Sequence, residues 1–326
     1  MVKDILDSLD RKILFNLDFN ARASNSEIAK KSRTSKEVVG YRIKRLIDVG
    51  VIKGFYTIID AARLGFMSCR FFIKLKNVSF EKEKEIISHF AEDKKYWWVD
   101  SIEGPFDLGV ACWLSDLNDF HLEEIKFMEE FGEYIKTINQ SIYVNFYIFK
   151  RAYFSNQPIN DVPPIKISNL GKEHLDKKDS ELLRFISSNA RVPITDIAEK
   201  LNWSVGSIVH RLKNLEKKKI ILTYRPLIDL SKIGRYWYKV NFTLKDHSKI
   251  DKIITFFNAH PDIVYAYETI GGPNLEMEAE VKSCEHFMEI LHYIRSKFGD
   301  SIECYDHFLW YKEYKLTFFP EISLRT

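Results

Sequence analysis

Apolar residues recur at helical spacing along the first fifty positions of the chain, which predicts three short helices. The first is expected near residues 8–17, and the second begins at Ser24, where Ser24-x-x-Glu27 has the pattern of a capping box. The third begins at Ser35, a favoured N-cap residue. The inward-facing residues are Leu9, Ile13, Leu17, Ile28, Ala29, Val39, Ile43 and Leu46. Two short helices, a tight turn and a further helix are typical of a helix-turn-helix motif.

The same pattern occurs twice. Residues 9–60 and 178–229 align at a constant offset of 169 without a gap, and fifteen of the 52 positions are identical. The identities include Asn20-Ala21-Arg22, which recurs as Asn189-Ala190-Arg191. A repeat of this length is too long for a solenoid. It indicates one two-domain unit duplicated in tandem.

Strand and helix patterns follow each helical copy in the same order. Behind the first copy, strands are expected at 71–75, 97–102, 108–114 and 138–149, with helices at 79–90 and 116–131. Behind the second copy, strands are expected at 238–244, 263–270, 275–281 and 302–311, with helices at 250–258 and 284–298. The order β-α-β-β-α-β predicts a ferredoxin-like unit. Glu276, Glu278 and Glu280 alternate with apolar residues, which predicts a strand with one buried and one polar face.

These patterns predict an α+β fold with two winged helix-turn-helix domains and two ferredoxin-like βαββαβ domains. The expected segments are 1–64, 65–152, a linker at 153–174, 175–233 and 234–313. The linker contains Pro158, Pro163 and Pro164 among polar residues, and the tail from Lys315 is expected to be irregular. Because a ferredoxin-like sheet leaves one face open, we expect the two ferredoxin-like copies to pack on each other as a pseudo-dimer within the chain.

Positive charge is concentrated on the helical copies. The whole chain of 326 residues has a net charge of +3, whereas residues 1–60 and residues 175–230 each carry +4. The rest of the chain is therefore acidic. This distribution is the electrostatic footprint of a polyanionic partner.

A fixed order of motifs runs through the first helical copy. The motifs are Leu9-Asp10-Arg11-Lys12-Ile13-Leu14, Asn20-Ala21-Arg22, Glu27-Ile28-Ala29, Val39-x-x-Arg42-Ile43-x-x-Leu46 and Gly50-Val51-Ile52-x-Gly54-Phe55. This order resembles the DNA-binding domain of the Lrp/AsnC, or feast/famine, regulators. Copy two departs from it at Lys218-Lys219-Ile220, which lacks the glycine, and at Thr223, which replaces Gly54. The resemblance covers about nine-tenths of the chain and implies a sequence-specific transcriptional regulator whose other half oligomerises and often binds an amino acid.

The resemblance and the charge indicate double-stranded DNA as the partner, with the third helix of each copy in the major groove. Residues expected at this interface are Ser35, Lys36, Gly40, Tyr41, Arg42, Lys44, Arg45, Ser204, Val205, His210, Arg211, Lys213 and Asn214. Arg42 and Arg211 hold the same repeat position, and each is expected to contact phosphate or to brace its helix. The outward residues differ between the copies, so we expect two unlike half-sites. The alternative is a second copy that no longer touches DNA.

Gly104 and Asp107 are the candidate effector-binding residues. They lie between the second and third regulatory strands and resemble the family's effector turn. Copy two keeps Gly271-Gly272-Pro273 but has Leu275 in place of Asp107. Plain hairpin chemistry is the alternative, because a Gly-Pro turn needs no ligand.

Other classes of protein lack support in the sequence. No stretch is long and apolar enough to span a bilayer, and the acidic N-terminus does not resemble a signal peptide. Four scattered cysteines indicate buried thiols in a reducing cytoplasm. Cys284, His286 and His292 do not share one helix face, so no metal is expected, and no cofactor or nucleophile motif is present.

Two alternatives share this layout. Siroheme decarboxylases resemble the same two-domain arrangement, but the segments 104–109 and 272–277, which correspond to their histidine-bearing strand motif, contain no histidine. A non-specific architectural DNA-binding protein would share the fold and the charge and would show little sequence preference.

Overall fold

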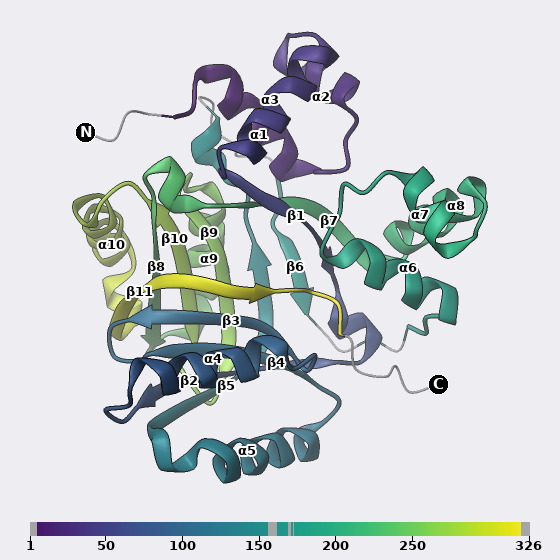
Figure 1. Ribbon diagram of the computed structural model, residues 1–326. Coiled ribbons are helices and arrows are strands. Elements are labelled where there is room, and N and C mark those ends of the chain that lie inside the picture. Colours follow the sequence, from purple (N-terminus) through teal and green to yellow (C-terminus); the bar gives the residue numbers. More distant parts are fainter. Residues whose placement is uncertain (1–4, 156–161, 169–170, 172, 321–326) are drawn as a thin grey trace.

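Each helical unit consists of three helices followed by a strand (Figure 1). The computed structural model describes residues 5–155, 162–168, 171 and 173–320. Copy one comprises α1 (Ser8–Phe19), α2 (Asn25–Ser32), α3 (Lys36–Asp48) and β1 (Ile52–Ile59). Copy two comprises α6 (Lys177–Ser187), α7 (Ile194–Leu201), α8 (Val205–Lys217) and β7 (Ile221–Ile228). The helical pattern predicted twice from the sequence is therefore present in both copies.

Side-chain caps set the starts of these helices. Ser24 and Glu27 form the predicted capping box, in which Ser24 Oγ accepts from the Glu27 amide at 3.2 Å and Glu27 Oε2 accepts from the Ser24 amide at 2.7 Å. Ser35 caps α3 and Ser204 caps α8. Each cap satisfies an amide that the helix itself leaves without a partner, which stabilises the helix at that residue.

Each regulatory copy is the predicted βαββαβ unit. Copy one comprises β2 (Met67–Leu75), α4 (Phe80–Glu92), β3 (Tyr96–Glu103), β4 (Leu108–Leu114), α5 (Leu117–Phe131) and β5 (Ile135–Ile148). Copy two comprises β8 (Tyr236–Leu244), α9 (Ile250–Ala259), β9 (Ile263–Ile270), β10 (Leu275–Val281), α10 (Cys284–Phe298) and β11 (Ile302–Leu316). The strands lie in the order β5-β2-β4-β3 in copy one and β11-β8-β10-β9 in copy two.

The last strand of each copy pairs with strands of both copies. The first half of β5 pairs with β2, and residues 142–148 pair with β9 of the other copy. In the same way β11 pairs first with β8 and then, over residues 309–316, with β3. Hydrogen bonding therefore runs round a closed circuit of eight strands, which we call the barrel. The predicted packing of the two regulatory copies on each other is confirmed.

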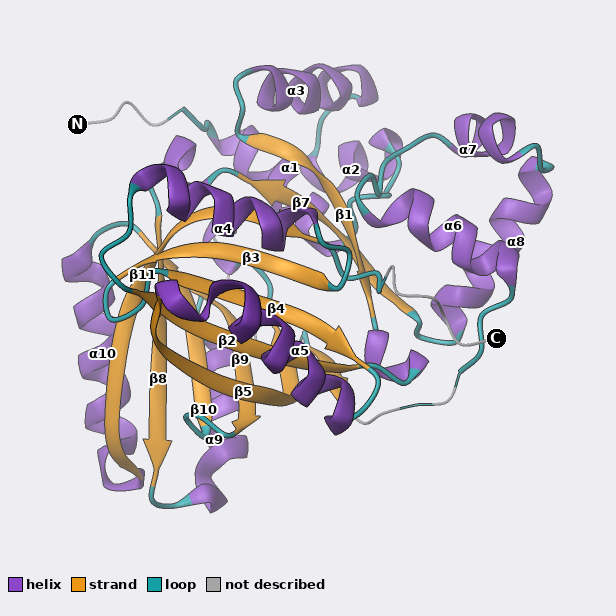
Figure 2. Ribbon diagram, turned by 60° about the horizontal axis from the view of Figure 1, so that its bottom comes forward, coloured by secondary structure: helices purple, strands orange, loops and turns teal. Residues whose placement is uncertain are grey.

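Helices cover the outside of the barrel on two sides (Figure 2). α4 and α5 lie against the strands of copy one, where Phe90 and Phe127 belong to one apolar core. α9 and α10 lie against the strands of copy two, where Phe257 and Phe287 belong to a second core. A third core fills the inside of the barrel and continues into the helical units.

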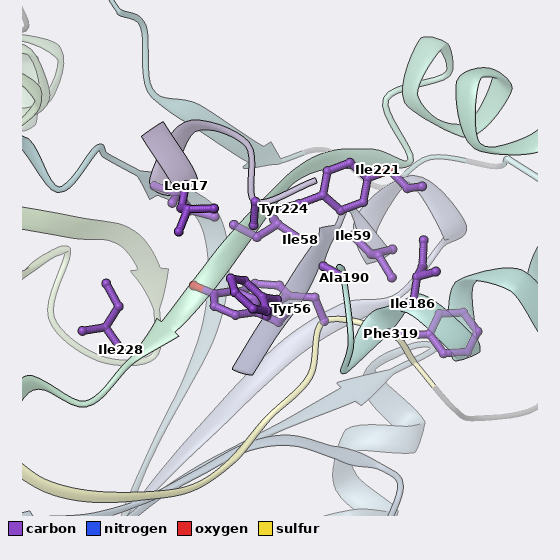
Figure 3. Close-up of a cluster of buried hydrophobic side chains, with 14 of the residues drawn as sticks. Leu17, Tyr56, Ile58, Ile59, Ile186, Ala190, Ile221, Tyr224, Ile228 and Phe319 are labelled. Carbon is purple, nitrogen blue, oxygen red and sulfur yellow. The ribbon is translucent and has the colours of Figure 1, made fainter. Parts of the chain in front are cut away.

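The helical units sit on a ribbon formed by β1 and β7, which pair antiparallel. Each unit packs its first helix on the strand of the other copy, so that α1 contacts β7 and α6 contacts β1. Figure 3 shows the shared cluster, in which Ile186 of α6, Ile59 of β1 and Tyr224 of β7 lie together. Phe319 of the C-terminal tail belongs to the same core.

Charged side chains lie inside the barrel, where the sequence had predicted a polar strand face. Glu276, Glu278 and Glu280 are each at most 2% exposed, so the polar face of β10 points inward and is buried as well. Arg70 of copy one reaches across the interior and donates to both carboxylate oxygens of Glu276, with Nη1 at 2.6 Å from Oε2. Lys239 Nζ lies 2.7 Å from Glu276 and 3.0 Å from Glu278. Burial alone would raise the pKa of Glu276, but these two cations lower it to about 2.

A second buried group joins the first helical unit to the barrel. Arg151 lies 2.9 Å from Glu280 and 3.1 Å from Asp18 of α1. Arg225 of β7 lies 2.5 Å from the same Asp18 carboxylate. Burial opposes ionisation of Asp18, but the charges of Arg225 and Arg151 lower its pKa to about 2. The position of α1 therefore depends on charges that lie inside the protein.

The two seams where the copies join carry different residues. At the β3–β11 seam Asp100 lies opposite Glu313, whereas the matching pair at the β5–β9 seam is Phe146 and Tyr267, with ring centroids 4.6 Å apart. Asp100 is fully buried and Glu313 is partly buried. Burial raises the pKa of Glu313 to about 7, and burial together with the nearby carboxylates raises the pKa of Asp100 well above its usual range.

Part of the segment predicted as a linker is a strand. Ile165–Ser168 form β6, which pairs antiparallel with residues 145–148 of β5 and buries Ile167. Pro163 and Pro164 precede this strand, and Pro158 lies outside the described residues. The tail is also more regular than predicted, because β11 continues to Leu316. Both segments gain order from contacts with distant strands, which local composition does not reveal.

We expect Arg70→Met to lower the free energy of unfolding by about 3 kcal/mol, because Glu276 then stays buried with only part of its counter-charge. Urea unfolding monitored by circular dichroism measures this change. The double variant Arg70→Met/Glu276→Gln should recover most of the lost free energy of unfolding, because the carboxylate that Arg70 neutralised is then absent. A double variant no more stable than Arg70→Met alone would contradict this account.

The stability of the chain should depend on pH through Glu313, whose pKa rises from 4.5 to about 7 on folding. The folded chain holds this proton to a higher pH than the unfolded chain, so the stabilising contribution is complete below about pH 4.5 and is lost as the pH rises towards 7. Glu313→Gln should therefore raise the free energy of unfolding by roughly 2 kcal/mol at about pH 8 and change little at about pH 4. Glu303→Gln, an exposed position on the same strand, is the control. An equal effect of Glu313→Gln at both pH values would count against this assignment.

Candidate nucleic-acid interface

The third helix of each unit buries one face and exposes the other. The buried residues are Val39, Ile43 and Leu46 in α3 and Ile208, Leu212 and Leu215 in α8. The exposed residues among those predicted to meet DNA are Ser35, Lys36, Tyr41 and Lys44 in copy one and Ser204, Val205, His210, Lys213 and Asn214 in copy two. Apolar packing at this spacing presents the polar stripe of each helix to solvent.

Three of the predicted interface residues have a structural role within the unit. Ser35 Oγ accepts from the Val38 amide, and Ser204 Oγ accepts from the Ser207 amide, both at 3.2 Å. Gly40 is partly buried, and a Cβ atom there would lie 3.1 Å from the side-chain Nδ2 of Asn25. Gly40 therefore allows α3 to lie close to the start of α2.

Arg42 and Arg211 brace the helices, which is one of the two roles predicted from the sequence. Arg42 Nη1 lies 2.5 Å from Asp7 and 3.2 Å from Asp10. Arg211 Nη1 makes the matching contacts in copy two, at 2.8 Å to Asp176 and 2.6 Å to Asp179. Each arginine thereby ties the third helix to the start of the first.

These ion pairs also explain two pKa shifts. Burial would raise the pKa of the Asp7 carboxyl, but the Asp10 amide and the Arg42 guanidinium lower it. Burial would likewise raise the pKa of Asp176, but the Asp179 amide and the Arg211 guanidinium lower it. Arg45 adds a further contact to Asp10 in copy one, where copy two has Asn214 at the matching repeat position.

Arg22 and Arg191 hold the two helical units together, because each donates to backbone carbonyls of the other unit. Arg22 Nη1 donates to the carbonyl of Ala190 at 2.6 Å. Arg191 Nη1 donates to the carbonyls of Ala21 and Ala23, the latter at 3.0 Å. From the sequence, this Asn-Ala-Arg motif stood out only as a repeated motif and as part of the family resemblance. Its recurrence in both copies was the available signal, because a residue that contacts the other copy must be kept twice.

The predicted effector residues are engaged within the regulatory domain. Asp107 Oδ1 accepts from Lys74 at 2.6 Å, and Oδ2 accepts from the Leu75 amide at 2.7 Å. Gly104 has φ of +149°, and a side chain there would lie 2.9 Å from the Cβ of Phe308. These are the contacts of a structured turn, so neither residue is placed by the structure alone as a ligand-binding group.

The turns of both copies line one cavity of about 890 Å³. Pro105 and Phe106 belong to the first turn, and Gly271, Gly272 and Pro273 belong to the second. The two turns thus meet at the junction between the regulatory copies.

The second turn also corrects the alignment made from the sequence. Asn274 Oδ1 accepts from the Leu244 amide at 2.7 Å, as Asp107 does from the Leu75 amide. Asn274, and not Leu275, therefore stands at the position of Asp107.

Other candidate chemistry is sparse in the part of the chain that the structure describes. No cluster of three metal-binding side chains occurs there. Cys69 and Cys112 are buried as predicted, but Cys284 and Cys304 are exposed, so the expectation of four buried thiols is wrong for the second pair. Within the same ranges, every helix is too short or too polar to cross a bilayer.

Comparison with known proteins identifies the helical units. The profile of winged helix-turn-helix DNA-binding domains matches residues 6–53 and again residues 175–221. The transcriptional regulator AldR of Mycolicibacterium smegmatis is 35% identical over 124 residues, which are 37% of this chain and 72% of AldR. The regulatory protein AsnC of Haemophilus influenzae is 37% identical over 127 residues, which are 38% of this chain and 85% of AsnC.

A solved structure resembles the whole chain. The crystal structure of the siroheme decarboxylase NirDL matches 95% of this chain and 93% of its own, with a TM-score of 0.62 and 13% sequence identity. At this identity the likeness shows the fold alone, which is the same tandem arrangement of helical and regulatory units. Since AldR and AsnC match over most of their own length, the chain belongs to the Lrp/AsnC family of helix-turn-helix regulators and carries the family's two-domain unit twice.

Proposed function

We propose that this chain is a sequence-specific DNA-binding transcriptional regulator. The observation that carries the proposal is the pair of exposed third helices with lysines at matching positions. Lys44 and Lys213 are exposed, and neither forms an ion pair with another described residue. Such unpaired cations on a helix that enters the major groove are suited to phosphate contacts.

The two helices would read different bases. Lys36 can donate to guanine in the major groove, whereas Val205 at the matching position can contact only a thymine methyl group. Asn214 is exposed and can bond adenine with two hydrogen bonds, whereas its counterpart Arg45 is held by Asp10. Tyr41 and His210 add a further difference. One chain would therefore recognise an asymmetric site with two unlike halves.

For the effector, we propose an amino acid or another small molecule in the cavity that the two turns share. Gly104 and Asp107 would act there by shaping the first turn, since their own bonding groups serve the hairpin. A cavity of about 890 Å³ is within the range that small-molecule sites occupy.

An enzyme of the siroheme decarboxylase type is the second candidate, and the likeness of NirDL along the whole chain favours it. The chemistry of this interior argues against it. The interior pocket of the barrel is lined by Glu278, Glu313 and aromatic rings, and its lining contains no histidine. These carboxylates would repel a substrate that carries several carboxylates of its own.

A gel-shift titration with genomic competitor DNA separates these functions. A sequence-specific regulator retains its target fragment against excess competitor DNA. An architectural protein loses the fragment in proportion to the competitor added. An enzyme of this type binds neither the fragment nor the competitor. Lys44→Ala and Lys213→Ala should each weaken binding to all sequences alike and reduce the slope of log affinity against log salt by roughly one unit. Lys136→Ala, an exposed lysine on β5, is the matched control. A change of base preference without a change of salt slope would contradict the phosphate role.

Selection of binding sites from a random DNA library tests the asymmetric reading of DNA. We expect two unlike half-sites about one helical turn, roughly 34 Å, apart. Arg22→Ala should weaken binding to the full site while leaving a single half-site unaffected, because it loosens the contact between the helical units. A palindrome would rule out the asymmetric model, and a motif with one half-site would indicate that copy two does not read DNA.

A further inference from the structure

The interior of the barrel has an acidic end that its own cations do not neutralise. Buried ion pairs link four cations, Arg70, Arg151, Arg225 and Lys239, with four carboxylates, Asp18, Glu276, Glu278 and Glu280. Asp100 and Glu313 stand outside this balanced network. Within the described residues, neither of them forms an ion pair. Two carboxyl groups thus face each other across the β3–β11 seam without a counter-charge.

Several buried polar atoms at this end lack a hydrogen-bond partner. Among the described residues they are Oε2 of Glu278 and the indole Nε1 atoms of Trp237 and Trp310. Both carboxyl oxygens of Asp100 are buried as well, and a side-chain hydrogen bond with Trp98 favours the ionised form of Asp100. Glu278 is 2% exposed and lines the interior pocket, and its Oε2 is a buried acceptor without a hydrogen-bond partner, whereas Oε1 accepts from Lys239. A buried carboxylate without a partner is costly, and a cation is the partner that relieves this cost most.

The space beside these atoms has two parts. A narrow interior pocket of about 30 Å³ is walled by Trp97, Trp98 and Trp237 and bounded by Glu278 and Glu313. It adjoins a cleft of about 700 Å³, with which it shares Trp237 and Glu313. The narrow pocket has room for one head group of about the size of a water molecule. The cleft has room for the rest of a small molecule.

The aromatic rings of this interior already hold cations. Lys239 Nζ lies 4.3 Å from the ring centroid of Tyr267 and 5.8 Å from that of Trp310. The Arg70 guanidinium lies 4.0 Å from the centroid of Phe72. Aromatic faces and carboxylates attract the same charge, so they act together on a positively charged head group.

We propose that the acidic end of the barrel binds a small organic cation, an ammonium group on an apolar body. The head group lies in the narrow pocket between Glu278 and Glu313, with Asp100 behind Glu313, and the body lies in the cleft against Trp237 and Trp310. The site is independent of the DNA-binding proposal, because it involves none of the residues on the exposed faces of α3 and α8.

Lys53 of β1 is the competing source of positive charge. It is exposed, lines the cleft and favours the ionised forms of Asp100 and Glu313, but it forms no ion pair with either group among the described residues. Arg151 also lines the cleft, where Glu280 and Asp18 already neutralise it. The test must therefore distinguish a bound amine from neutralisation by Lys53.

The site should select by charge. A cation gains ion pairs with Glu278 and Glu313, a neutral analogue gains only apolar contact, and an anion is repelled. An amino acid brings a carboxylate next to its ammonium group, so it should bind less tightly than the matching amine. The order of affinity therefore identifies the chemistry of the site without knowledge of the natural ligand.

Isothermal titration of the full chain with four probes tests this order. The probes are 2-phenylethylamine, 2-phenylethanol, 3-phenylpropanoate and L-phenylalanine, at about pH 8, where Glu313 is ionised in the folded chain. We expect 2-phenylethylamine to bind at least tenfold more tightly than each of the others, which corresponds to roughly 1.4 kcal/mol. Quenching of tryptophan fluorescence should follow the same titration, because Trp97, Trp98 and Trp237 wall the pocket.

Variants then locate the site. Glu313→Gln should weaken the amine roughly tenfold and leave 2-phenylethanol unchanged, because only the charge is removed. Asp100→Asn keeps the shape of the side chain at position 100. It should likewise weaken binding of the amine and leave 2-phenylethanol unchanged. Glu303→Gln on the exposed part of β11 should bind the amine as the parent chain does. Trp237→Phe provides a variant that leaves every buried charge in place and should reduce affinity for amine and alcohol alike.

Three results would overturn the proposal. They are equal affinity for the amine and the alcohol, unchanged amine affinity in Glu313→Gln, and no amine binding tighter than about 10 mM. In the last case, loss of stability in Lys53→Met would show that Lys53 is the counter-ion. DNA is absent from all of these titrations, so their failure leaves the proposed regulator untouched, and failure of the gel shifts leaves this site untouched.

Discussion

Everything else in the molecule depends on the way in which β5 and β11 divide their hydrogen bonds between the two copies. The first half of each strand completes its own regulatory sheet, and the second half pairs with the edge strand of the other copy. This division closes the barrel, and closure removes water from the inward faces of both sheets. Arg70 and Glu276 can then pair across the interior, and Arg151 can hold α1 through Asp18. A protein with two separate regulatory sheets would have to solvate each of these charges.

Because both copies belong to one chain, they are free to differ. In a pair of identical subunits every inward residue would appear twice, and a second row of glutamates would overload the interior with negative charge. Here Gly109 and Ala111 of β4 take the places of Glu276 and Glu278 of β10, and Arg70 of copy one supplies a charge for copy two. The same freedom allows the β3–β11 seam to carry Asp100 and Glu313 where the β5–β9 seam carries Phe146 and Tyr267. It also allows the exposed faces of α3 and α8 to carry different side chains.

The repeat and the two periodicities predicted every α-helix of the described residues and most strands, because apolar spacing follows directly from burial on one face. They did not reveal which elements meet. Glu276, Glu278 and Glu280 alternate with apolar residues as an exposed strand face would. Their burial is tolerable because Arg70, Lys239 and Arg151, which are distant in sequence, pair with them. Arg22 and Arg191 were visible as a repeated motif, but their partners lie in the other copy. For the interface, helical spacing identified the exposed residues, whereas the bracing of Arg42 by Asp7 required the fold.

The cleft beside the β3–β11 seam is lined in part by β1 and β7, the strands that carry the helical units. Lys53 and Tyr56 belong to β1, and Leu227 and Ile228 belong to β7, while Trp310 belongs to the barrel. A molecule that fills the cleft therefore contacts both parts at once. If the chain binds DNA as proposed, such a molecule changes the affinity for DNA only if it binds two arrangements of these parts with different affinities. DNA then changes the affinity for the molecule by the same factor. The Arg22 and Arg191 contacts resist such a rearrangement between the helical units, since each arginine donates to backbone carbonyls of the other copy. Any coupling must therefore act by moving the helical pair as one body against the barrel, with the buried Arg151 pairs as the point of resistance.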